Sequence, residues 1–78
     1  MNVTVKLFGT LRRFSDPDTP GLWRGEIADG ARIRDLIRAI GTSEAEVAAA
    51  ALDNVNCPLE TIIPAGAVVT LVTPMGGG

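Results

Sequence analysis

Polar and apolar side chains alternate at the start of the chain. In residues 2–7, the even-numbered positions are polar (Asn2, Thr4 and Lys6) and the odd-numbered positions are apolar (Val3, Val5 and Leu7). This period of two predicts a β-strand that buries one face. Phe8 follows on the polar parity, so we expect its aromatic ring on the face that meets water.

A helical pattern occupies the middle of the chain. Apolar residues recur at the spacing i, i+3, i+4 and i+7 in Ile33, Leu36, Ile37 and Ile40. This spacing predicts an amphipathic helix with one buried stripe. Asp29 and Gly30 form a turn signal before the helix, and Gly41 stands where a left-handed C-terminal cap is expected.

The remaining segments predict shorter elements. They are a helical turn at 9–14, a loop at 16–21, a strand at 22–28, a short helix from Ser43 that gives way to a strand by Leu52, a turn at 64–66 and a strand at 67–72. Ser43 and Glu46 have the spacing of a capping box. Pro58 limits any strand within 55–63 to an edge or a short bridge.

The order of these elements predicts the fold class. Two strands before one helix, and two or three strands after it, make an α+β arrangement. The first and last strands have the best hydrophobic patterns, so we place them side by side and parallel at the centre of the sheet. This layout is the β-grasp, or ubiquitin-like, fold, in which a mixed four- to five-stranded sheet wraps one main helix. We expect the β-grasp domain at 1–72 and a flexible C-terminal glycine tail at 73–78.

Composition and charge narrow the range of partners. The chain has 78 residues, of which 46% are hydrophobic and 21% are charged, as in a globular protein with one small core. Its net charge of −2 predicts neither nucleic acid nor an anionic membrane as a partner. The apolar stretches fall far short of the ~20 residues of a membrane span, and the alternating start is unlike a signal peptide. We therefore expect a cytoplasmic protein.

The inventory of reactive side chains argues against an enzyme. The chain has no His, no Tyr and one Cys, so it cannot build a Ser-His-Asp triad, a Cys-His pair, a four-Cys metal site or an internal disulfide. Two pairs of neighbouring carboxylates are interpreted as solvated groups: Asp16 with Asp18, and Glu44 with Glu46. Cys57 lies between Asn56 and Pro58, with nothing to activate its thiol. We expect no bound cofactor and no metal site.

Three glycines follow the last predicted strand at the end of the sequence. Because glycine has no Cβ, Gly76, Gly77 and Gly78 could be drawn extended into a channel too narrow for other residues. The five residues from Pro74 to Gly78 could reach about 16 Å. Such a tail predicts a C-terminus that is delivered to another protein. The alternative is a frayed end or a cloning residue.

An apolar surface is predicted near the start of this tail. The polar side chain of Thr70 indicates which parity of the last strand faces water, and that parity includes Val68 and Val72. If the first strand lies beside the last, Phe8 joins these two valines in an apolar patch. Such patches mark interaction sites. In the alternative arrangement, residues 12–14 fold over Phe8 and cover it.

Several segments, taken in order, resemble the ThiS and MoaD family of ubiquitin-like sulfur carrier proteins. The ending at 70–78 is similar to that family's final strand, short Pro-containing link and terminal Gly-Gly. The opening at 5–12 looks like the start of the MoaD branch, and 29–36 looks like the turn and helix entry common to both branches. Residues 64–66 fall where the family has a turn before its last strand. The resemblance covers nearly the whole chain.

This resemblance implies a carrier rather than an enzyme. A partner adenylyltransferase of the MoeB/ThiF type would use ATP and Mg²⁺ to adenylate the Gly78 carboxylate, and a sulfur donor would convert it to a thiocarboxylate. A synthase subunit in molybdenum cofactor (molybdopterin) or thiamin biosynthesis would accept the sulfur. Gly76 and Gly77 would give the tail access to these partners. The residues expected to bind the partners are Phe8, Val68, Val72, Pro74 and Met75.

Two other functions fit the same features. A ubiquitin-like modifier would form isopeptide bonds to lysines through the same activated Gly78. A plain β-grasp binding module would have a glycine tail that does no chemistry. The sequence does not distinguish the carrier function from the modifier function, because both begin with the same activation step.

Overall fold

A computed structural model describes residues 1–74 of the protein. Its elements in chain order are β1 (Asn2–Leu7), the 3₁₀-helix η1 (Gly9–Phe14), β2 (Leu22–Glu26), α1 (Ile33–Ile40), the 3₁₀-helix η2 (Glu44–Glu46), β3 (Ala49–Leu52), β4 (Val55–Cys57) and β5 (Val68–Val72). Each element lies within the segment whose pattern predicted it. Hydrophobic periodicity located β1 and α1, whereas β4 lies in a segment without a regular pattern, where only an edge or bridge strand was expected.

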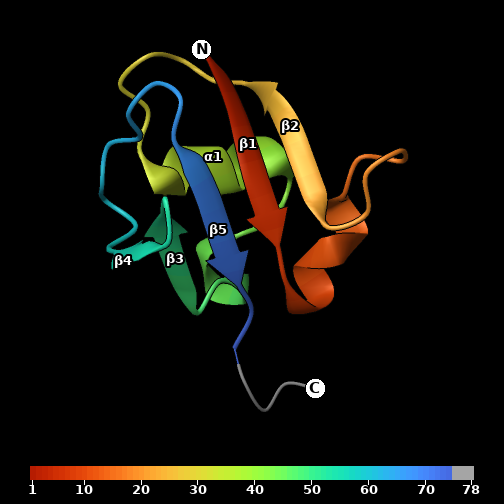
Figure 1. The fold of residues 1–78 in the computed structure, drawn as a ribbon. Helices are drawn as coiled ribbons and strands as arrows, with labels where there is room; N and C mark the ends of the chain where they lie inside the picture. The colour runs from red at the N-terminus through yellow and green to blue at the C-terminus, as the bar shows by residue number, and fades with distance from the viewer. Residues whose placement is uncertain (75–78) are drawn as a thin grey trace.

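The five strands form one mixed sheet in the order β2-β1-β5-β3-β4 (Figure 1). β1 and β5 run parallel to each other, and the other three strand pairs are antiparallel. The first and last strands thus lie side by side in the middle of the sheet. This arrangement confirms the predicted α+β, β-grasp fold. β4 is a three-residue edge strand that ends just before Pro58, as the missing N–H of proline requires.

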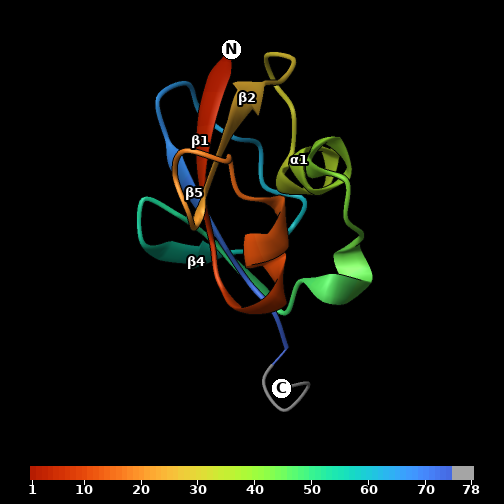
Figure 2. The same cartoon turned by 90° about the vertical axis from the view of Figure 1, so that its right-hand side faces the viewer.

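Helix α1 packs on one face of the sheet, and no helix covers the opposite face within the described part of the chain (Figure 2). The predicted apolar stripe of α1 is buried, as are the apolar parities of β1 and β5. The nine largest fully buried side chains are Val5, Leu7, Leu11, Ile33, Leu36, Ile37, Ile63, Val69 and Leu71. The uncovered sheet face, here called the outer face, is where partner-binding side chains were predicted.

Both ends of α1 have backbone partners. The N–H groups of Ile33 and Arg34 donate to the carbonyls of Thr61 and Leu59, at 3.1 and 3.0 Å. These loop carbonyls satisfy donors that the first turn of a helix leaves free. Gly41 has a φ of 111° and ends the helix in the left-handed conformation, which confirms the predicted cap. Within 1–74, no helix has both the length and the apolar character needed to cross a bilayer.

The capping box predicted at the start of η2 is wrong. The Ser43 side chain makes no cap hydrogen bond. The Glu46 carboxylate instead accepts hydrogen bonds from Arg13 and Thr42. A charged donor 33 residues away competes for the carboxylate, and local spacing gives no sign of it.

Candidate functional site

Three side chains form a row across the outer face where the chain leaves the sheet. The β1–β5 ladder pairs Leu7 with Leu71, and the Phe8 N–H donates to the Leu71 carbonyl at 3.1 Å. This bond belongs to the Leu7–Leu71 pair, which is the last of the ladder, and Phe8 and Val72 are the next residues along the two strands. On the other side of β5, Val72 pairs with Ala49 of β3. We call Phe8, Val72 and Ala49 the tail-root row.

The ring of Phe8 is accessible. Phe8 is 46% exposed as a residue, and it is one of three large hydrophobic residues exposed within the described chain, with Val55 and Ile62. η1 does not fold over it, because Leu11 points into the core and the Arg13 guanidinium stacks on Phe14 instead. The alternative in which residues 12–14 cover Phe8 is therefore excluded.

Val68 lies away from the tail root. It shares the outer face with Val72, as predicted, but its partner across the ladder is Thr4. Four residues of β-strand separate the two valines, which is about 13 Å. The Lys6–Thr70 pair lies between them. The expectation that Val68 joins Phe8 in one patch at the tail root is corrected by this register.

Ala49 was missed in the sequence because its segment reads as an ambiguous apolar run. Once β3 is known to pair with β5, the register puts Ala49 beside Val72. Residues 48–51 are all alanine, so no polar and apolar alternation in the sequence marks Ala49 as the outward-facing residue.

The first residues after β5 lie against the turn between β1 and η1. Gly9 has a φ of +64°, and the side chain of Thr73 occupies the space that a Cβ at Gly9 would need. Glycine thus permits both the turn and the close approach of Thr73. Pro74 follows and is exposed. The other tail residues with predicted roles, Met75 and 76–78, lie outside the described residues.

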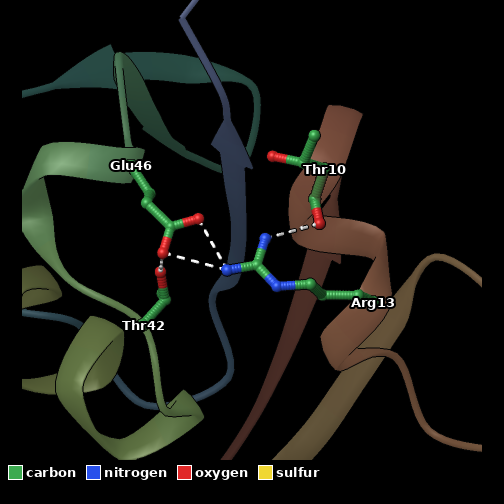
Figure 3. A network of polar contacts seen from close by, with 4 residues as sticks. All are labelled: Thr10, Arg13, Thr42 and Glu46. Atoms are coloured by element: carbon green, nitrogen blue, oxygen red, sulfur yellow. Dashed lines mark hydrogen bonds and ion pairs between the residues drawn. The ribbon is translucent and has the colours of Figure 1, made fainter.

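A polar network joins η1 to η2 (Figure 3). Nη2 of Arg13 lies 2.9 and 2.7 Å from the two carboxylate oxygens of Glu46, and Nη1 of Arg13 donates to the Thr10 carbonyl at 3.0 Å. The Thr42 hydroxyl donates to the same carboxylate at 2.9 Å. Glu46 is therefore a bound group rather than the solvated carboxylate expected from the sequence. Because η1 also contacts β1 and β5, the network braces the end of the sheet from which the tail departs.

This network predicts a pH-dependent contribution to stability. The hydrogen bonds from Arg13 and then Thr42 lower the pKa of Glu46 below its ordinary value of 4.5. A carboxyl with a lowered pKa in the folded state stabilises the fold above its unfolded pKa and loses that contribution as the pH falls through its folded pKa. Glu46→Gln should therefore be less stable than the wild type at neutral pH, and the difference should shrink below about pH 4.5.

Urea unfolding at a series of pH values measures this difference. Glu26→Gln is the matched control, because Glu26 forms no ion pair with any other residue in 1–74. A Glu46→Gln deficit that stays constant down to pH 3, or a control with the same profile, would refute the assignment.

Cys57 and the acidic residues form no further candidate site in the structure as described. Cys57 is a half-buried free thiol on β4, opposite Ala50. Across residues 1–74, no three His, Cys, Asp or Glu side chains gather where they could hold a metal ion. The tail-root row is thus the candidate site that the structure places beside the tail.

Comparison with known proteins gives a family match and structural neighbours. The ThiS family model matches residues 5–78, and no curated protein sequence matches significantly. The fold is similar to small archaeal modifier protein 1 of Haloferax volcanii, with a TM-score of 0.71, 16% identity, and 94% of this chain and 97% of that chain covered. It is also similar to a protein described as molybdopterin converting factor, subunit 1, from Pyrococcus furiosus, with a TM-score of 0.70, 24% identity, and coverage of 95% and 98%. At these identities, the two neighbours establish the fold alone.

Proposed function

The chain belongs to the ThiS family, and from that membership we propose that it is a sulfur carrier protein whose reactive group is the Gly78 carboxylate. Proteins of this family work with partner enzymes in sulfur transfer. The observation that carries the proposal is that the family match runs from β1 through the last glycine of the sequence.

The proposed chemistry takes place on the terminal carboxylate. A carboxylate oxygen attacks the α-phosphorus of ATP, pyrophosphate leaves, and an acyl-adenylate forms. A sulfur nucleophile then attacks the carbonyl carbon, AMP leaves, and the product is a thiocarboxylate. The first step is needed because a carboxylate is a poor electrophile until its oxygen becomes a good leaving group. ATP and Mg²⁺ belong to the partner, where the cation neutralises the phosphates.

The carrier itself contributes shape and reach. It has no His and one Cys, so it offers few side chains for acid-base or nucleophilic catalysis. Its proposed role is to present the tail in a fixed direction from a folded domain, which turns a bimolecular encounter into a positioned reaction. In this proposal the protein is a substrate of its partners and not an enzyme.

The proposed partners are an adenylyltransferase of the MoeB/ThiF type and a synthase subunit that accepts the sulfur. The name of the Pyrococcus furiosus neighbour favours molybdopterin biosynthesis, and the family match equally supports thiamin biosynthesis. We propose that Phe8 and Val72 anchor both partners, with Pro74 and Met75 entering the partner's channel ahead of Gly76 and Gly77. We propose that the carrier acts in the cytoplasm.

The second candidate function is protein modification. A solved structure with this fold is a small archaeal modifier protein, which is the observation that favours it. In this case the same activated Gly78 would form an isopeptide bond with a lysine amine. The two functions differ in the nucleophile that displaces AMP.

The proposal is tested by incubating the full chain with the adenylyltransferase from the same cell, ATP and Mg²⁺. Pyrophosphate release that depends on the carrier, followed by thiocarboxylate formation when sulfide is added, is the expected result. Transfer to lysines of cell proteins without thiocarboxylate would favour the modifier. The absence of any carrier-dependent pyrophosphate release would refute both.

Phe8→Ala should weaken binding to the adenylyltransferase by about 1 to 3 kcal/mol, because exposed aromatic residues at the centre of an interface act as anchors. The maximal rate of adenylation should be unchanged, since the tail is intact. Isothermal titration calorimetry gives the affinity. Val55→Ala is the control, because Val55 is 68% exposed but lies on the edge strand β4. Equal affinities of the two variants would remove Phe8 from the interface.

A further inference from the structure

The outer face carries positive charge at Lys6, in the row beside the tail-root row, and at Arg24, one row farther away. We propose that Lys6 and Arg24 dock against carboxylates that border the apolar pocket of the tail-binding partner. The occupant of this surface is thus a protein with an acidic rim around an apolar centre. This inference rests on the proposed function and adds the chemistry of the partner surface.

The two cations share one face of neighbouring strands. Lys6 pairs with Leu22 in the β1–β2 register, and Arg24 pairs with Thr4. The side chains of all four residues therefore point to the outer face. Lys6 lies in the row of paired residues next to Phe8, and Arg24 lies one row farther along the strands. Both cationic side chains are exposed.

Lys6 and Arg24 have no ionic or hydrogen-bonding partner among the described residues. Within 1–74, neither Lys6 nor Arg24 forms an ion pair or donates a side-chain hydrogen bond. The arginines on other surfaces do have partners. Those pairs are Arg13 with Glu46, Arg34 with Glu60, Arg38 with Glu44, and Arg32 with the Glu60 carbonyl.

Few acidic residues lie on the strands, although the chain as a whole has a net charge of −2. Glu26 is the only acidic residue on any of the five described strands, and it pairs with Asn2 at the end of β1 farthest from Phe8. A third cation, Arg12, has its guanidinium against Gly21, the residue just before β2. Glu26 is the next outward-facing residue after Arg24 on β2, and the N–H of Asp16 donates to the Leu22 carbonyl at 2.8 Å, so β1 and β2 present two cations against one carboxylate on the outer face.

Charge complementarity selects the partner. Exposed cations beside an apolar anchor attract a negative surface over a Debye length, steer its approach and fix its register. Such rim charges act mainly on the rate of association and its salt dependence rather than on the chemistry. A partner with a positive or neutral rim would gain nothing from Lys6 and Arg24.

The test compares two double charge reversals in adenylation of the full chain. Lys6→Glu with Arg24→Glu changes the outer face, and Arg32→Glu with Arg38→Glu makes the same change of net charge on exposed helix-side residues. At low ionic strength the first should raise KM for the carrier about tenfold with kcat unchanged, and the second should change KM less than about twofold. The difference should fade as NaCl is raised to about 0.5 M.

The outcomes separate this inference from the function on which it rests. If the wild type is not adenylated, the proposed function fails and the inference fails with it. If the wild type is adenylated but both double variants have the same KM, the inference alone is overturned. The same holds if the difference in KM does not change with the NaCl concentration. It is also overturned if sedimentation shows that the reversal changes self-association of the carrier, because the occupant would then be a second copy.

Two further variants guard against loss of the fold. Lys6→Arg with Arg24→Lys keeps both charges and should keep the wild-type KM. Lys6→Gln with Arg24→Gln removes the charges without adding repulsion and should give an intermediate KM. Urea unfolding of each variant identifies any change that comes from instability, and wild-type KM in the glutamine variant would also overturn the inference.

Discussion

Deleting Gly77 and Gly78 is expected to abolish adenylation, with the free energy of unfolding within about 0.5 kcal/mol of the full chain. The deletion leaves a carboxylate on Gly76 but withdraws it by up to about 7 Å from the partner's active site. Reacting atoms must come within about 3.5 Å, so a shift of this size removes the reaction. The buried core of the described residues runs from Val3 to Leu71, so the fold should not need the last two glycines.

Two full-length variants sharpen this test. Gly77→Leu keeps the terminal carboxylate and the length of the tail, and it should also lose adenylation because a branched side chain does not fit a narrow channel. Val55→Ala, remote from the tail, should be adenylated like the wild type. If the truncated chain were adenylated as well as the full one, the carrier proposal would fail. The binding module with a tail that does no chemistry would then be the better interpretation.

Leu36→Ala is expected to have the largest effect on folding, about 2 to 5 kcal/mol of destabilisation. Leu36 is 0% exposed and lies in the core cluster between α1 and the sheet. Its truncation removes apolar contacts and leaves a cavity that a core of this size closes only in part. Urea unfolding followed by circular dichroism gives the free energy.

The matched control for Leu36→Ala is again Val55→Ala, an apolar truncation at an exposed position that should cost less than about 0.5 kcal/mol. A Leu36→Ala cost below about 1 kcal/mol would mean that the buried face of the helix is assigned wrongly.

The sequence predicted the fold because its strongest signals are local. The alternation around Val5 and the helical spacing around Leu36 each place one face against the core, and both faces are buried as predicted. Gly41 ends the helix in the left-handed conformation for which glycine is suited. The pairing of β1 with β5 followed from the topology rules for two strands that flank a helix.

The candidate site was predicted only in part, because it depends on register and on long-range contacts. Parity put Val68 and Val72 on the outer face, but only the ladder to β1 shows that Val72 alone is next to Phe8. Ala49 could be placed only after β3 was paired with β5. The bond from Arg13 to Glu46 spans 33 residues and has no local signature.

The most direct test of the sulfur carrier function is the mass of the protein isolated from its own cells. A sulfur carrier should yield a fraction whose mass is raised by exchange of one oxygen for one sulfur, with the increase located on Gly78 by fragmentation. Location matters because oxidation of Met1 or Met75 adds nearly the same mass. A Gly78 that carries an ordinary carboxylate in every fraction, with any added mass found on methionine, would contradict the sulfur carrier function.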